Sequence, residues 1–115
     1  MSNAIDKITS HFNKLVTNNL QEGYIEEWDL KFWYYPTYSI RDNIKSMELN
    51  AQGKVLEALI ENIITKAKNE DGSRMFAPAS KSRLMNEADP KVIIKMAGIM
   101  NNDAEAMDAE EIEKN

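Results

Sequence analysis

The chain has 115 residues, of which 43% are hydrophobic and 29% are charged, a composition typical of one globular domain. It has no cysteine, so a disulfide scaffold, a Cys-based zinc site, an iron–sulfur cluster and a thiol nucleophile are excluded. No apolar run approaches the ~20 residues that a membrane span needs, and the first residues show no signal-peptide pattern. We therefore expect a cytoplasmic protein that has no membrane partner.

The net charge of −5 is concentrated at one end of the chain. Residues 103–115 contain six acidic residues and one lysine, whereas acids and bases balance in residues 1–102. The sequence has no basic stripe to hold a nucleic-acid backbone, so nucleic acid is not an expected partner. We predict one domain over residues 1–102 and a disordered acidic tail over residues 103–115.

Apolar residues at helical spacing predict a first helix that ends near Thr17. Ser2 or Asn3 can cap its first turn, and Asp6 lies near the positive end of the helix dipole. The apolar positions of this helix are Ile5, Ile8, Phe12, Leu15 and Val16.

Residues 24–35 have the pattern of a two-stranded β-hairpin. A short β-prone run at Tyr24-Ile25 is followed by a polar turn over residues 26–29 and by alternating residues from Leu30 to Tyr35. Pro36 ends the second strand because it has no N–H to donate. An isolated hairpin is marginally stable in water, so we expect this one to lie against helices.

Two further helices are predicted between residues 39 and 68, with a break at Gly53. Thr37 or Ser39 caps the first, with Asp42 in the position of a capping box. Its expected inward face consists of Ile40, Ile44 and Met47. The second has the widest apolar stripe of the chain, made of Val55, Leu56, Leu59, Ile60, Ile63, Ile64 and Ala67. Its charged neighbours Lys54, Glu57, Glu61 and Lys68 are expected to face solvent.

The remainder of the domain predicts a turn, a loop and two more helices. Gly72 can take the positive φ of a turn, and Met75 and Phe76 are expected to anchor the following loop in the core. Ser80 and Asp89-Pro90 mark the starts of a short helix and of the last helix. The inward residues of the last helix are Val92, Ile93, Met96, Ala97, Ile99 and Met100. The predicted fold class is therefore mainly α, with four to five helices packed on one small β-hairpin.

No motif in the sequence predicts catalysis, a cofactor or a metal. His11, the only histidine, lies beside Phe12 on a helix, which is typical of a surface or boundary position. Glu26, Glu27 and Asp29 fall in a predicted turn, where solvated carboxylates are commoner than a metal or acid–base site. The four glycines are scattered and form no phosphate-binding pattern. We expect a binding protein and not an enzyme.

Aromatic and methionine side chains are the candidate contacts with a partner. Five Trp and Tyr residues fall between positions 28 and 38, and such residues dominate interface hot spots. Seven methionines, several on the last two helices, can form an adaptable groove, although core packing is the ordinary role of both groups. The candidate partner-binding residues are Trp28, Phe32, Trp33, Tyr35, Met96 and Met100.

The order of these elements and several short motifs resemble the tail assembly chaperones of long-tailed bacteriophages, over about residues 22–102. Glu27-Trp28 opens a β segment, Pro36-Thr37 starts a helix, and a final amphipathic helix ends at Asn101-Asn102. The most specific motif is Asp71-Gly72-x-x-x-Phe76 between two helices. The chain departs from the family in its additional N-terminal helix and in lacking an arginine in the second strand, where Trp33 or Tyr34 stands.

The resemblance implies a protein that binds the tape measure protein before the tail tube assembles around it. Members of the family often self-associate, are absent from the finished virion, and in many cases have a longer form made by ribosomal frameshifting. Residues 113–115 can be encoded as GAA AAA AAC, which contains a slippery heptamer. The implied location is the host cytoplasm, the implied main partner is the tape measure protein, and the tail tube protein is a second candidate.

Two other functions are compatible with the same sequence. One is a small structural head–tail or tail protein of the virion, which analysis of purified particles would distinguish from a chaperone. The other is a phage regulatory protein that binds a host protein. The neutral charge of residues 1–102 argues against a mimic of nucleic acid.

Overall fold

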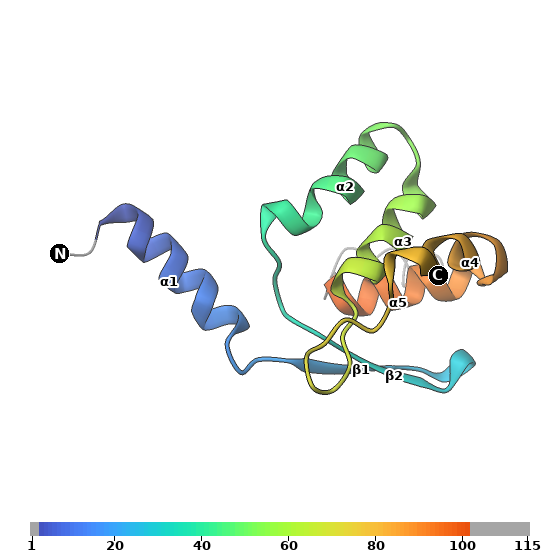
Figure 1. Cartoon of the computed structure of the whole chain (residues 1–115), viewed down its shortest axis with the longest axis horizontal. Coiled ribbons are helices and arrows are strands. Elements are labelled where there is room, and N and C mark those ends of the chain that lie inside the picture. Colours follow the sequence, from blue (N-terminus) through green and yellow to red (C-terminus); the bar gives the residue numbers. More distant parts are fainter. Residues whose placement is uncertain (1–2, 102–115) are drawn as a thin grey trace, which may run out of the picture.

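The computed structural model describes residues 3–101, so the predicted acidic tail lies outside the described residues. Within this range the chain forms five α-helices and one two-stranded antiparallel sheet (Figure 1), which confirms the predicted fold class. The helices are α1 (Ala4–Val16), α2 (Ile40–Ala51), α3 (Val55–Lys66), α4 (Lys81–Glu87) and α5 (Pro90–Asn101), and the strands are β1 (Gln21–Ile25) and β2 (Leu30–Tyr34). Two short 3-10 turns, η1 (Glu26–Trp28) and η2 (Pro78–Ser80), precede β2 and α4.

Three of the predicted helix caps are confirmed. Asn3, Ser39 and Asp89 each accept a hydrogen bond from a backbone N–H of the first helical turn, at 2.9 to 3.2 Å. Each bond satisfies one of the N–H groups that a helix start leaves without an intrahelical partner. Ser80 precedes α4 as predicted, but its side chain makes no cap hydrogen bond, because α4 continues directly from the 3-10 turn η2.

The hairpin spans residues 21–34, so its first strand begins three residues before the predicted start at residue 24. The predicted turn over residues 26–29 is confirmed, and its last residue, Asp29, has a φ of +46°, in the left-handed region. After α3 the chain runs beside β2, where Lys68 and Trp33 exchange two backbone hydrogen bonds of 2.8 and 2.9 Å. This pairing covers part of the otherwise open edge of β2.

The core lies between the hairpin on one side and α3 and α5 on the other (Figure 1). Ile25 and Phe32 project from the strands and are fully buried. Met75 and Phe76 pack against this core from the loop before α4, as predicted. The remaining fully or nearly fully buried core residues are Tyr34, Ile60, Ile63, Ile64, Ala67, Val92, Ile93, Met96 and Met100.

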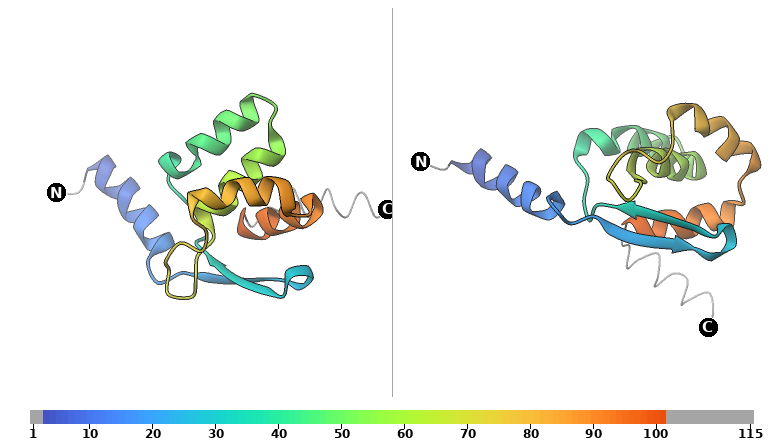
Figure 2. Two further views of the ribbon diagram at one scale, coloured as in Figure 1. Left: turned by 45° about the vertical axis from the view of Figure 1, so that its right-hand side comes forward. Right: turned by 60° about the horizontal axis from the view of Figure 1, so that its bottom comes forward.

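Helices α2 and α4 pack against α3, whereas α1 projects away from the body of the molecule (Figures 1 and 2). The extents of 51 × 33 × 28 Å and the radius of gyration of 15.4 Å reflect this projecting helix. A compact chain of 100 residues has a radius of gyration of about 13 Å. No residue of α1 is fully buried.

The burial of α2 and α3 corrects two predictions. The expected inward residues of α2, Ile40, Ile44 and Met47, are exposed, and Ser46 and Leu49 are buried instead. Val55 and Leu56 at the start of α3 are also exposed. Glu61 was expected in solvent but is only 8% exposed. Its ion pairs with Lys45 and Lys81 compensate the cost of burying its charge.

Candidate binding surface

The α2–α3 hairpin carries apolar side chains that the rest of residues 3–101 leaves uncovered. Large side chains from one face of α2 and from the first turn of α3 are exposed to between 45% and 76%. Apolar residues scattered singly on a surface are ordinary, whereas a group of them on neighbouring elements marks an interaction site. We call this group the α2–α3 apolar surface, and it consists of Ile40, Ile44, Met47, Val55 and Leu56.

Four charged residues join α2 and α4 to α3. The carboxylate of Glu61 lies 3.4 Å from the ammonium of Lys45 on α2 and 2.9 Å from that of Lys81 on α4. Lys81 also donates to Glu57 at 2.8 Å. These two carboxylates raise the pKa of Lys81, and Lys81 lowers the pKa of Glu57. The opposite face of α2, which carries Ser46 and Leu49, is buried, so the apolar face of α2 is turned outward.

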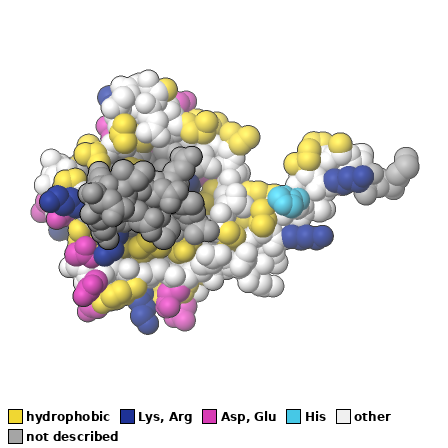
Figure 3. Space-filling model, turned by 180° about the vertical axis from the view of Figure 1, so that it is seen from behind, with side chains coloured by type: hydrophobic (Ala, Val, Ile, Leu, Met, Phe, Trp, Pro, Cys, Tyr) yellow, Lys and Arg dark blue, Asp and Glu magenta, His cyan; other side chains and the backbone are white. Residues whose placement is uncertain are grey.

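The projecting helix α1 presents a second uncovered apolar group. Ile5 and Ile8 are each 64% exposed, although they belong to the apolar face that the sequence predicts. Phe12, Leu15 and Val16 on the same face are partly covered where α1 approaches the body. Figure 3 shows hydrophobic side chains on α1 and along the edge of the body. An amphipathic helix gains most of its stability from packing that face, and within the described residues only the second half of α1 has part of this packing.

The six residues predicted to bind a partner fall into two groups. Phe32, Met96 and Met100 are buried in the core and do not reach the surface in this conformation, which corrects the expectation that they form a contact surface. Trp28, Trp33 and Tyr35 are half-buried. Trp28 packs against the core from the hairpin turn, whereas Tyr35 follows β2 at the other end of the hairpin and lies beside α1, so these two aromatics do not converge on one site.

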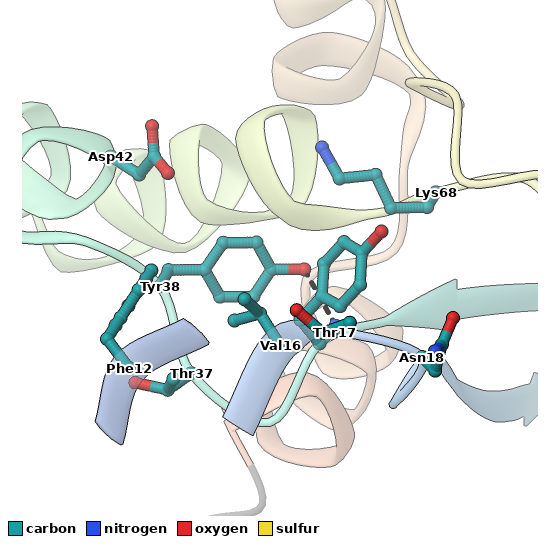
Figure 4. Close-up of a pocket in the computed structure, with 9 residues that line it drawn as sticks. Phe12, Val16, Thr17, Asn18, Thr37, Tyr38, Asp42 and Lys68 are labelled. Carbon is teal, nitrogen blue, oxygen red and sulfur yellow. Dashed lines mark hydrogen bonds between the residues drawn. The ribbon is translucent and has the colours of Figure 1, made fainter. Parts of the chain in front are cut away.

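A hollow of about 410 Å³ lies between the end of α1 and the linker that joins β2 to α2 (Figure 4). Phe12 and Val16 of α1 form its apolar wall, and Tyr35, Tyr38 and Lys68 line the other side. The volume falls within the usual range of ligand pockets, and the lining combines aromatic surface with a few polar groups.

Tyr38 ties this linker to the end of α3. Its hydroxyl donates to the carbonyl of Lys66 at 2.7 Å and accepts from the backbone N–H of Tyr35 at 3.0 Å. Burial raises the pKa of Tyr38 to about 12. The ammonium of Lys66 lies 5.3 Å from the centre of the Tyr38 ring, within the range of a cation–π contact.

The sequence predicted little of this surface. It indicated the apolar face of α1, but not that the body leaves this face uncovered. It also gave no signal for the cluster of Tyr38, Lys66 and Lys68, because these side chains meet through the path of the linker and not through a local pattern. In the part of the chain that the structure describes, no cluster of His, Cys, Asp or Glu could hold a metal ion, and no helix is both long and apolar enough to span a membrane.

No protein-family model and no curated protein matches this sequence. Among solved structures, the chain is similar to the structure of the bacteriophage HK97 tail assembly chaperone. The similarity has a TM-score of 0.54 and covers 85% of this chain and 97% of the other, at 14% sequence identity. At this identity the likeness is one of fold. The fold of this chain thus resembles that of a phage tail assembly chaperone, the kind of protein that the sequence motifs indicated.

Proposed function

We propose that this chain is a tail assembly chaperone of a long-tailed bacteriophage, which binds the tape measure protein and keeps it soluble until the tail tube assembles. The resemblance of the fold to the HK97 tail assembly chaperone supports a role of this general kind. The proposal includes self-association, a location in the host cytoplasm, absence from the mature virion, a frameshifted longer form, and the tail tube protein as a second partner. It includes no catalytic activity.

One observation carries the proposal: within residues 3–101, large apolar side chains of α1, α2 and α3 are exposed although the protein has a buried core of its own. A chaperone of a long helical protein has to cover apolar helix faces that would otherwise aggregate. A surface of Ile, Val, Leu and Met on two packed helices suits this task, because an amphipathic helix binds by laying its apolar residues along such a surface.

The contact residues that we propose differ from those expected from the sequence. The α2–α3 apolar surface takes the place of Met96 and Met100, which are buried. Trp33 and Tyr35 are additional candidates, since both are half-buried and lie where the chain after α3 meets β2. Trp28 also stays a candidate, at the hairpin turn.

Co-expression with the tape measure protein of the same phage tests the proposal. The native chain should raise the soluble fraction of the tape measure protein, and Ile40→Gln with Met47→Gln should abolish most of that gain without unfolding the chaperone. Met85→Gln on α4 is the matched control, because Met85 is also exposed, at 45%, but lies outside the α2–α3 apolar surface. Equal loss in the control, or no gain from the native chain, would contradict the proposal. Detection of the chain in purified virions by mass spectrometry would favour a structural protein instead.

A further inference from the structure

The end of α3 holds three cationic side chains with little negative charge around them. Lys66 is only 6% exposed, Lys68 is half-buried, and Arg74 lies close enough to Lys68 to lower its pKa. Within residues 3–101, neither lysine has a carboxylate at ion-pair distance, and Asp42 is the acidic group whose field reaches both. Burial lowers the pKa of both lysines.

The side chains of Lys66, Lys68 and Arg74 form a cationic cluster, and neutral groups satisfy its hydrogen-bond donors only in part. Lys68 donates to the carbonyl of Thr65 at 3.2 Å, and Arg74 donates to that of Ile64 at 3.3 Å. These carbonyls belong to the C-terminal end of α3, which contributes only about half a negative charge. A buried ammonium is stable when it is paired, so this cluster favours a further carboxylate.

The hollow beside α1 gives a carboxylate access to the cluster. Lys68 lines the hollow directly, and the Tyr38 ring both lines it and lies under the ammonium of Lys66. Asp42 also lines the hollow, and Figure 4 shows it on the other side of the Tyr38 ring from Lys68, so the positively charged side of the hollow is the one at Lys68. An acidic peptide could therefore place a carboxylate at Lys68 and rest its apolar residues on Phe12 and Val16.

We propose that the acidic segment 103–115 of the same chain occupies this hollow. The segment has six acids and one lysine, opposite in sign to the cluster, and it also has two apolar residues, Met107 and Ile112, that suit the apolar wall. It leaves the body from α5, whose last described turn lies beside the end of α3 (Figures 1 and 2). Thirteen residues can span roughly 45 Å, close to the longest dimension of the described chain, 51 Å.

The covalent link makes even a weak contact sufficient. A segment joined to its binding site by a short stretch of the same chain has an effective concentration on the order of 1 mM. A segment that binds as a free peptide with a Kd of about 1 mM would therefore occupy the hollow about half of the time. Salt should weaken the contact, because Lys68 is only half-buried and charges that solvent reaches are screened within a Debye length of ~10 Å at 0.1 M.

A spin label on the segment tests the proposal on the full-length chain. Because the chain has no cysteine, Ala109→Cys provides a single attachment point. The label should broaden the amide NMR signals of Tyr35, Thr37, Tyr38 and Lys68 at low salt. Changing the six acids of the segment to their amides (Asp103→Asn, Glu105→Gln, Asp108→Asn, Glu110→Gln, Glu111→Gln and Glu113→Gln) should remove this broadening.

Matched lysine variants and a mixing experiment complete the test. Lys68→Gln should reduce severalfold the fraction of molecules in which segment 103–115 occupies the hollow. Adding Lys66→Met to Lys68→Gln should reduce this fraction further. Lys91→Gln, an exposed lysine on α5, should leave it unchanged. The proposal would be overturned if the spin-labelled Ala109→Cys chain showed no broadening. It would also be overturned if Lys68→Gln and Lys91→Gln, made in that chain, showed equal broadening. Broadening of an isotope-labelled chain by a separate spin-labelled chain would assign the site to the segment of a second copy, which also overturns it.

Discussion

Gly23 lies against the ring of Phe32, its partner across the hairpin. A Cβ at Gly23 would come within 2.8 and 2.9 Å of Cε2 and Cε1 of that ring, and closer still to Cζ. The ring itself is fully buried and is fixed by the packing of the core, so it cannot move aside without cost. The glycine is therefore required for the hairpin to hold Phe32 in the core.

We predict that Gly23→Ala lowers the free energy of unfolding by about 1–3 kcal/mol, the range of an overpacked core. Glu22→Ala is the control on the same strand. Glu22 is exposed and has only a long, solvated ion pair of 3.8 Å with Lys31, worth ~0–1 kcal/mol. Urea denaturation of both variants measures the difference, and an equal loss in both would show that Gly23 has no special role.

The hydroxyl of Tyr38 satisfies two backbone groups at once, the N–H of Tyr35 and the carbonyl of Lys66. Tyr38→Phe leaves both without this partner, so we expect a loss of about 1–3 kcal/mol. Tyr35→Phe is the control, because it keeps the ring beside Tyr38 and removes a hydroxyl that does not make these bonds. Thermal unfolding compares the two variants, and equal melting temperatures would contradict the expectation.

The raised pKa of Tyr38 also predicts a dependence of stability on pH. In the unfolded chain a tyrosine ionises near pH 10, whereas in the folded protein the pKa of Tyr38 is about 12. Folding keeps this group protonated, so its contribution is complete below pH 10 and is lost as the pH rises through 12. The native protein should therefore lose more stability than Tyr38→Phe between pH 10 and pH 12. Lysines titrate in this range in both proteins, so the difference between the two curves is the measurement.

At the scale of the elements, Glu61 connects three helices through one carboxylate. Glu61→Gln keeps the shape of the side chain but removes its charge, leaving Lys81 with Glu57 alone and Lys45 without its pair. We expect a loss of about 1–3 kcal/mol, since Glu61 is nearly buried while Lys45 is exposed. Glu87→Gln breaks an exposed pair with Arg83 and should cost less than 1 kcal/mol. Chemical denaturation at low and high salt separates the two cases.

The sequence predicted where most elements begin and end, but not which way α2 faces. The spacing of Ile40, Ile44 and Met47 showed that α2 has an apolar face, and a lone helix of this pattern is expected to bury it. In the structure α2 buries Ser46 and Leu49 instead. The contacts that join α2 and its preceding linker to α3 lie far along the chain, namely Tyr38 with Lys66 and Lys45 with Glu61. Pairs that lie 28 and 16 positions apart leave no trace in a local pattern.

For the whole molecule, the sequence predicted the mainly α fold, its single hairpin and most of the core, because these follow from local periodicity and turn residues. It did not separate Met96 and Met100, which fill the core, from Met47, which is exposed, because all three lie on apolar helix faces. Whether such a face is covered depends on the packing of neighbouring helices. The same reason explains why the exposure of α1 could not be predicted from its pattern.

The uncovered face of α1 leads to a prediction about self-association, which is part of the proposed function. Burying the exposed parts of Ile5 and Ile8 in an interface would contribute about 1–2 kcal/mol each. Ile5→Gln with Ile8→Gln should therefore weaken an assembly of copies about a hundredfold. The melting temperature of a dilute monomer should stay the same, because α1 buries no residue fully in its own chain. Light scattering over a range of concentrations measures the assembly, with Met85→Gln as the exposed control on α4. A monomeric native chain, or a double variant that assembles as well as the control, would show that this face of α1 serves another partner.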